Sequence, residues 1–82
     1  MPKQPTKTVE DLVNAYKEGK KHLTRGNHRY ELRNGVAYFY YWETPVCIVR
    51  ENGRVEYDDG GYSESPSTRW TIASYKYFFG EN

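Results

Sequence analysis

The sequence predicts an α+β domain in which an N-terminal helix, a four-stranded antiparallel β-meander and a C-terminal helix follow one another. Apolar residues near the N-terminus recur with the helical period of about 3.6, whereas those in the middle of the chain alternate with a period of about two. Two Asn-Gly pairs divide the alternating region, and a Ser-Pro pair opens a second helical segment after it. Because 82 residues suit one domain, we expect a flexible tail over residues 1–7 and a single domain over residues 8–82.

Composition excludes several functional classes. Twelve basic and eleven acidic residues give a net charge of +1, which is too balanced for a protein that binds mainly by neutralising a phosphate backbone. The single cysteine, Cys47, excludes an internal disulfide, and its apolar neighbours favour a small buried hydrophobe. No apolar run reaches the length of a signal peptide or a membrane span, so we expect a cytoplasmic protein that makes no membrane contact.

The first element is a predicted helix at about residues 9–18. Its apolar residues fall at i, i+3, i+4 and i+7, so they share one side of the helix: Val9, Leu12, Val13 and Tyr16. Thr8 suits the N-cap, and Gly19 stands where a helix commonly ends in a left-handed residue. We therefore expect this helix to cover one face of the sheet.

A basic segment follows this helix and contains Lys20, Lys21, His22, Arg25, His28 and Arg29. It has two interpretations: a solvated linker before the sheet, or an edge that contacts phosphate. The two histidines have no cysteine or carboxylate nearby at metal-ligand spacing, so we expect no metal site.

Two predicted hairpins form the sheet, each around an Asn-Gly pair that favours a two-residue type I′ turn. The four strands are His28–Arg33, Val36–Trp42, Pro45–Glu51 and Arg54–Asp58. The turns set three pairs: Arg33 with Val36, Trp42 with Pro45, and Arg50 with Val55. The resulting core face carries Tyr30, Leu32, Ala37, Phe39, Tyr41, Val46, Ile48, Val55 and Tyr57.

The opposite face is unusual because three large aromatic residues, Tyr38, Tyr40 and Trp42, stand in a row on it. Its other members are Arg29, Glu31, Arg33, Val36, Cys47, Val49, Arg54 and Glu56. Cross-strand aromatic pairing, or a helix or partner on that side, would account for the aromatic row. The other interpretation is a stacking platform for bases or for a partner protein, with Arg29 and Arg33 beside it.

The stretch from Asp58 to Trp70 joins the sheet to the second helix. Two glycines, Gly60 and Gly61, allow a turn with positive φ, and Ser65 followed by Pro66 suits the start of a helix. The stretch is either a strand-to-helix joint alone or also an anion site. In the second case, the free amides of the helix start would hold phosphate together with Ser67, Thr68 and Arg69.

The second predicted helix, Pro66 to Phe79, ends before Gly80 and has apolar residues on two sides. Either it lies between the sheet and the first helix, or one of its sides mediates assembly. We assign assembly to Ile72, Tyr75 and Phe79, which predicts a homo-oligomer, because an exposed aromatic side would be a liability in a monomer.

Several stretches show a shared order of motifs: an aromatic strand, a Val/Ile-containing strand with a tight turn, a Gly-Gly-aromatic element and a Ser-Thr-Arg helix start. They are Tyr38 to Trp42, Thr44 to Val49, Asn52-Gly53, Gly60-Gly61-Tyr62, and Ser67-Thr68-Arg69 with Ile72. In this order, about the C-terminal two-thirds of the chain resembles a small domain of unknown function that is common in phage genomes. The resemblance implies a phage or prophage origin, a host bacterial cytoplasm and no known enzymatic activity. Pro66, Trp70 and Thr71 depart from that pattern.

The residues themselves argue against an enzyme, because no histidine–carboxylate or cysteine–histidine pair forms a local catalytic motif. We expect no cofactor. Together with the resemblance, this predicts a non-catalytic binding protein that inhibits a host antiviral defence, by occupying a protein surface or by sequestering a nucleotide signal. The expected contact residues are Tyr38, Tyr40, Trp42, Arg29, Arg33, Ser67, Thr68 and Arg69. The alternatives are a structural assembly subunit and a nucleic-acid-binding module that uses Lys20, Lys21, Arg25, Arg29 and Arg33.

Overall fold

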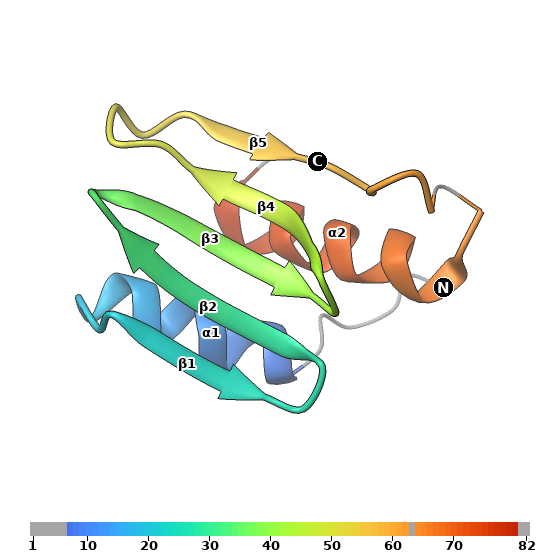
Figure 1. Cartoon of the computed structure of the whole chain (residues 1–82), viewed down its shortest axis with the longest axis horizontal. Coiled ribbons are helices and arrows are strands. Elements are labelled where there is room, and N and C mark those ends of the chain that lie inside the picture. The colour runs from blue at the N-terminus through green and yellow to red at the C-terminus, as the bar shows by residue number, and fades with distance from the viewer. Residues whose placement is uncertain (1–6, 63, 81–82) are drawn as a thin grey trace.

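The computed structural model describes residues 7–62 and 64–80, and in it two helices pack on one face of a five-stranded antiparallel sheet (Figure 1). The elements are α1 (Lys7–Lys17), β1 (His22–Arg25), β2 (His28–Arg33), β3 (Val36–Tyr41), β4 (Thr44–Val49), β5 (Val55–Tyr57) and α2 (Pro66–Phe79). Each strand pairs with the next one in the sequence. The α+β class is confirmed, with one strand more than expected. The expected tail lies outside the described residues, except that Lys7 already belongs to α1.

The additional strand, β1, occupies the basic segment that one interpretation took as a linker. It pairs with β2 in the register His22↔Glu31, and a turn at Gly26 and Asn27 joins the two strands, with Gly26 at a φ of 58°. Of its four residues only Leu23 is half-buried, so the strand shows no apolar alternation. The linker interpretation is therefore wrong, because a polar edge strand leaves little hydrophobic signal in the sequence.

Helix α1 begins before Thr8, so the N-cap assignment of that residue is wrong. The other end is as predicted. Gly19 has a φ of 80°, and its N–H donates to the carbonyl of Tyr16 at 3.1 Å, while the N–H of Lys20 donates to the carbonyl of Ala15 at 3.0 Å. This pair of bonds is the Schellman motif that a C-terminal glycine favours. The predicted apolar stripe packs into the core with Val9, Leu12, Val13 and Tyr16.

The first predicted hairpin is confirmed in its register, since β2 and β3 pair from Arg33↔Val36 onward as expected. Asn34 and Gly35 both have positive φ, at 52° and 80°, which is the conformation of a type I′ turn. Strand β3 ends one residue earlier than expected, which leaves Trp42 in the next turn.

The register of β4 differs from the prediction. The turn before it contains only Trp42 and Glu43, so Tyr41, the last residue of β3, pairs with Thr44. The predicted pair was Trp42 with Pro45. A register shift in the middle of the β3–β4 pairing follows.

At this bulge the neighbouring residues Val46 and Cys47 are both fully buried. Beyond it, Val49 faces the core, whereas Ile48 is only half-buried and pairs with Tyr38 on the other face. The predicted faces of Cys47, Ile48 and Val49 are therefore wrong, because a shift of one residue moves each side chain to the opposite side. The expectation that Cys47 is a buried hydrophobe is confirmed.

The second Asn-Gly pair forms a longer turn than expected. The N–H of Arg50 donates to the carbonyl of Arg54 at 2.8 Å, which closes a three-residue loop, Glu51–Gly53, whose last residue has a φ of 88°. Val55 then pairs with Val49 and not with Arg50. The predicted pair is wrong because an Asn-Gly sequence also fits a three-residue loop with a left-handed glycine at its end.

The side of helix α2 that the sequence analysis predicts to mediate assembly faces the core instead. Tyr75 is fully buried with its ring centre 5.0 Å from that of Phe39, and Ile72 and Phe79 pack against the same core. The predicted oligomer interface is therefore wrong for these residues, because the core of the chain itself uses them. On the opposite side of the helix, Tyr77 is 62% exposed.

Both helices lie behind the sheet in Figure 1, so the face toward the viewer carries no helix. We call this face the open face. Its residues include Arg29, Glu31, Arg33, Tyr38, Tyr40, Ile48, Arg50, Arg54 and Glu56. Within residues 7–62 and 64–80, no helix is long and apolar enough to cross a membrane.

Candidate functional site

Two tyrosines and two arginines on the open face form a stacked ladder. The rings of Tyr38 and Tyr40 lie 6.3 Å apart and are nearly parallel. The Arg29 guanidinium lies 4.2 Å from the centre of the Tyr40 ring, and Arg33 lies 4.5 Å from the centre of Tyr38. Arg33 Nη2 also donates a hydrogen bond to Tyr40 Oη at 2.6 Å. Between the two arginines, Glu31 approaches their Nε atoms at 2.9 and 3.6 Å. The four predicted contact residues on these strands therefore lie together and hold one another in place.

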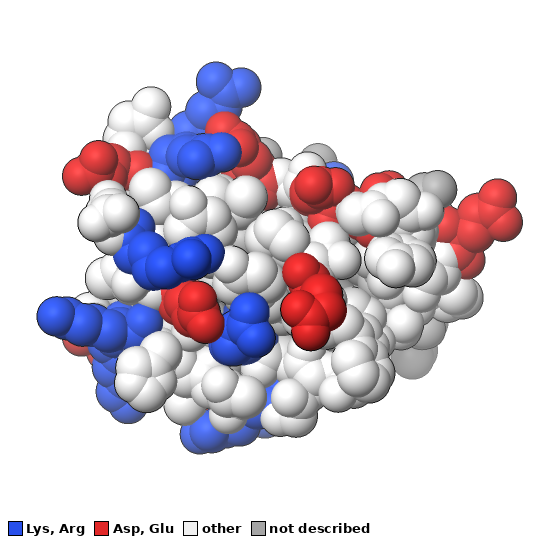
Figure 2. All heavy atoms as spheres, in the orientation of Figure 1, with Lys and Arg blue, Asp and Glu red and all other residues white. Residues whose placement is uncertain are grey.

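A second carboxylate sits between two further arginines of the open face. Arg50 Nη2 donates to Glu56 Oε1 at 2.9 Å, and Arg54 Nε lies 3.8 Å from Glu56 Oε2. The hydrogen bond from Arg50 holds the pKa of the Glu56 carboxyl below its ordinary value. Figure 2 shows the result, in which basic and acidic groups alternate with uncharged surface across the open face. Each of these two carboxylates meets two guanidiniums, so the four arginines and two glutamates together keep a surplus of positive charge.

Basic residues expected to serve a nucleic-acid-binding module also have acidic neighbours. Arg25 Nε lies 3.8 Å from Asp11 of α1, and Lys20 Nζ lies 3.4 Å from Glu18. Exposed pairs of this kind add little stability, but they cancel the positive potential on which binding to a phosphate backbone depends. At Lys20 and Arg25 the acidic neighbours therefore reduce the attraction of this edge for a nucleic acid.

Trp42 does not join Tyr38 and Tyr40 on the open face, contrary to the prediction. It is the first residue of the β3–β4 turn, with a φ of 57°, and its side chain is 62% exposed. Its ring centre lies 6.4 Å from that of Tyr41, which packs on the helix side of the sheet. A bulky residue in the left-handed region costs about 1–2 kcal/mol. The turn thus holds an exposed indole in a strained conformation at the end of the sheet.

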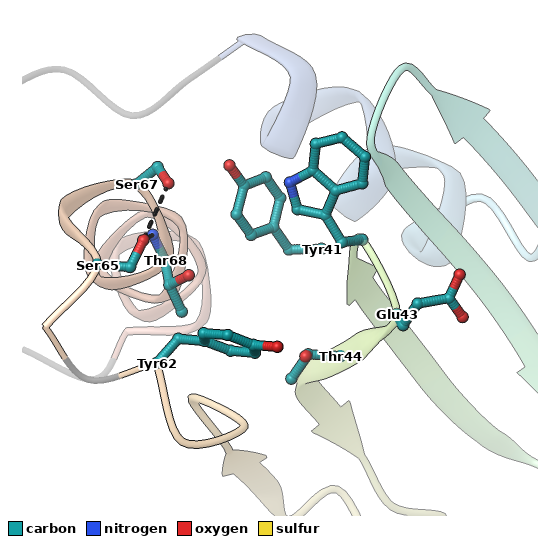
Figure 3. A pocket seen from close by; sticks show the side chains of 8 residues that line it. Tyr41, Glu43, Thr44, Tyr62, Ser65, Ser67 and Thr68 are labelled. Atoms are coloured by element: carbon teal, nitrogen blue, oxygen red, sulfur yellow. Dashed lines mark hydrogen bonds between the residues drawn. The ribbon is translucent and has the colours of Figure 1, made fainter.

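A cavity of about 320 Å³ lies where the β3–β4 turn meets the start of α2 (Figure 3). We call it the turn cavity, and its lining consists of Tyr41, Trp42, Glu43, Thr44, Tyr62, Ser65, Ser67 and Thr68. Three aromatic side chains and four serine or threonine side chains make up most of this lining. Within residues 7–62 and 64–80, Glu43 is the one charged residue of the lining, and the Glu43 carboxylate points away from α2 in Figure 3.

The sequence interpretation placed only Trp42, Ser67 and Thr68 of this lining among the contact residues. Tyr41 was assigned to the core, because a regular alternation puts it on the buried face. Tyr62 comes from the loop after β5 and is 60% exposed. The signal for Tyr62 in the sequence is its position directly after a Gly-Gly pair. A turn alone does not require an aromatic residue there.

The start of α2 is capped as predicted. Ser65 has extended backbone and its Oγ accepts the N–H of Thr68 at 3.4 Å, while its carbonyl accepts the N–H of Arg69 at 3.1 Å. Pro66 stands at the first helical position and has no N–H to offer. The helix then ends at Gly80 with a φ of 79°. Because its own residues use several of the first amides, the helix start has a reduced capacity to bind an anion.

Arg69 lies apart from the two hydroxyl residues that precede it. Ser67 and Thr68 line the turn cavity, whereas Arg69 lines a separate hollow with Tyr57, Asp58, Asp59, Ile72, Ala73 and Lys76. Successive residues of a helix point about 100° apart, so three neighbours cannot all face one ligand. The predicted phosphate site at Ser67, Thr68 and Arg69 is therefore divided, and no lysine or arginine of the part of the chain that the structure describes lines the turn cavity.

The chemistry of these surfaces is stacking and hydrogen bonding. Among the described residues, no group of three or more His, Cys, Asp or Glu side chains is placed to hold a metal ion. His28 is half-buried with its ring 4.9 Å from that of Tyr41, and burial lowers the pKa of its imidazole.

No family model, curated protein or solved structure matches this chain.

Proposed function

We propose that this protein is a non-catalytic binding protein that covers a surface of another protein, and that the open face of the sheet is its contact surface. The ladder of Arg29, Arg33, Tyr38 and Tyr40 is the observation that carries the proposal. Tyrosine and arginine are enriched among the residues that dominate binding energy at protein interfaces. Because stacking and a hydrogen bond already fix these side chains, little conformational entropy remains to be lost on binding.

The charges of the open face indicate the chemistry of the partner. Its four arginines exceed its two glutamates, Glu31 and Glu56, and each glutamate lies between two guanidiniums. A partner with a flat, mildly acidic surface would complement this pattern, and its carboxylates could share the arginines without leaving a buried charge unpaired. In the phage context that the resemblance implies, the partner is a host antiviral protein whose working surface becomes covered.

Sequestration of a nucleotide receives less support. That mechanism needs the aromatic platform and the phosphate-binding residues on one surface. Tyr38 and Tyr40 lie on the open face, whereas Ser67 and Thr68 line a cavity on the helix side of the sheet. Arg69 faces a third region. The covering of a protein surface needs only the open face and so fits the geometry better.

Affinity capture from a bacterial lysate tests the proposal. The bait should be the whole chain, as wild type and as the double variant Tyr38→Ser/Tyr40→Ser, which removes the two rings and leaves the arginines. We expect wild type to retain a bacterial protein that the double variant loses. Recombinant forms of that protein should then bind wild type with an affinity that falls moderately as salt rises, because rim charges steer the complex.

Tyr77→Ser is the matched control, because Tyr77 is 62% exposed on α2, away from the open face. It should retain the partner at the level of wild type. Equal capture by wild type and by the double variant would refute the assignment of the open face. Circular dichroism of each bait must show the same fold, so that a lost partner reports on the surface and not on unfolding.

A further inference from the structure

The turn cavity has no part in the proposed contact of the open face. Tyr40 and Tyr41 are neighbours on β3 and therefore point to opposite sides of the sheet, one to the open face and one to the cavity. No residue of the Arg–Tyr ladder lines the cavity. A ligand in the cavity and a protein on the open face would thus bind independently.

The walls of the cavity are suited to a flat ring. Tyr41 and Trp42 come from the end of β3 and its turn, and Tyr62 comes from the loop that precedes α2. In Figure 3 the rings of Tyr41 and Tyr62 approach the cavity from these two different elements. Trp42 and Tyr62 are 62% and 60% exposed, so a ring that lies against either of them would cover apolar surface that is now in water.

The polar groups of the cavity favour an uncharged ligand that accepts hydrogen bonds. Hydroxyl groups of Thr44, Ser67 and Thr68 lie along its lining, and the positive end of the α2 dipole adds to their pull on acceptor atoms. Among the described residues, no lysine or arginine lines the cavity to hold phosphate. The Glu43 carboxylate points away from α2. The described lining therefore places no carboxylate where it could pair with a cationic ligand between the aromatic rings.

The size of the cavity suits one ring system. Its volume of about 320 Å³ is at the lower end of the range for small-molecule sites. We propose that the turn cavity binds a nucleobase, with the faces of the base against the aromatic side chains and its carbonyl or ring-nitrogen acceptors on the hydroxyl groups. Two sources present this chemistry: a free nucleoside and an unpaired base of a single-stranded nucleic acid.

Two-dimensional amide NMR of the whole chain tests this. The four common ribonucleosides are the probes, each titrated to about 10 mM, because stacking on one or two rings gives dissociation constants in the millimolar to high micromolar range. The chain has two tryptophans, so two indole N–H signals are expected. The signal of Trp42 should shift with at least one nucleoside, and the signal of Trp70, which does not line the cavity, should stay in place.

Two exposed tyrosines provide the variant and its control. Tyr62→Ser removes one wall and should weaken binding at least about tenfold, whereas Tyr77→Ser should bind as wild type does. A nucleoside monophosphate should bind no tighter than its nucleoside. A short single-stranded oligonucleotide that shifts the same signals at lower concentration would identify nucleic acid as the source of the base, and equal or weaker binding would identify the free nucleoside.

Three results would overturn the proposal. The first is no shift of the Trp42 signal with any nucleoside or oligonucleotide. The second is equal binding by Tyr62→Ser and wild type. The third is a site that takes N-acetyltryptophanamide but no nucleoside, because the cavity would then receive an aromatic side chain of a protein.

Discussion

The loop that carries Tyr62 depends on Gly60, and alanine at Gly60 should destabilise the protein more than alanine at the neighbouring Gly61. Both glycines have positive φ, at 62° and 86°. An alanine in this region loses about 1–2 kcal/mol, partly offset by about 0.4–1 kcal/mol from the less flexible unfolded chain. On this account alone, each variant should lose about 1 kcal/mol.

The two positions differ in the space for a Cβ atom. At Gly61 nothing lies within 4 Å, whereas at Gly60 the new Cβ would lie 2.7 Å from Thr44 Cγ2 and 2.8 Å from Thr44 Oγ1. Threonine is stiff at χ1 and sits in β4, so it cannot easily turn away. Overpacking of this kind typically adds about 1–3 kcal/mol. Gly60→Ala should therefore lose about 2–4 kcal/mol in total.

Urea denaturation followed by circular dichroism measures both variants against wild type. For a domain of this size, each kcal/mol corresponds to about 4–8 °C in the melting temperature, so thermal scans should separate the variants clearly. The double variant Gly60→Ala/Thr44→Ala should recover the part of the loss that exceeds Gly61→Ala. Equal losses at Gly60 and Gly61, or no recovery on removing the threonine side chain, would refute the contact with β4.

Three further predictions concern strain, tyrosine hydroxyl groups and a half-buried imidazole. Trp42→Gly should be about 1 kcal/mol more stable than Trp42→Ala by urea titration, because both lose the indole but only glycine adopts a φ of 57° freely; equal stability would show that the turn is unstrained. Within the described residues the hydroxyl of Tyr75 has no hydrogen-bond partner, so Tyr75→Phe should be as stable as wild type or more so, whereas Tyr30→Phe loses a 2.6 Å bond to a main-chain carbonyl and should cost about 1 kcal/mol. Burial lowers the pKa of His28 below 6.5, so the unfolded chain takes up the proton first: the contribution to stability is complete above about pH 6.5 and is lost as the pH falls below it. His28→Gln should therefore flatten the fall in urea midpoint between about pH 7 and pH 5, and an equally steep fall in this variant would contradict the effect of burial.

The elements that sequence patterns predicted well are those whose local chemistry permits one geometry. Asn34 and Gly35 both tolerate positive φ, so their turn is type I′ and it fixes the whole register of β2 against β3. Ser65 followed by Pro66 starts α2, and Gly19 ends α1, for equally local reasons. In each case the residues of the turn or cap determine the outcome without help from distant contacts.

The second half of the sheet could not be predicted in the same way, because tertiary packing overrides local preference there. Nothing in the sequence marks Trp42 as a residue with positive φ, so the alternating pattern predicts a strand that includes it. The bulge that buries Val46 and Cys47 together likewise has no signal in an alternating pattern.

These two differences in the sheet also explain why the candidate site differs from the predicted one. With β3 continued through Trp42, alternation placed the indole beside Tyr38 and Tyr40. The structure places it instead in the β3–β4 turn beside Tyr41, where it lines the same cavity as Tyr62 from the loop after β5. The ladder with Arg29 was predictable because it lies within the correctly registered hairpin; the turn cavity was not, because it joins two loops.

The contact between the two helices sets an order of events during synthesis. Each strand pairs with its neighbour in the sequence, so hairpins can form as they leave the ribosome, at about 5–20 residues per second. Part of the apolar side of α1 waits longer, because Tyr16 meets Phe79 at 6.1 Å in addition to rings of the sheet, and α2 is the last of these elements to be made. A ribosome stalled before α2 should therefore hold a nascent chain with paired strands that binds chaperones through the uncovered side of its sheet.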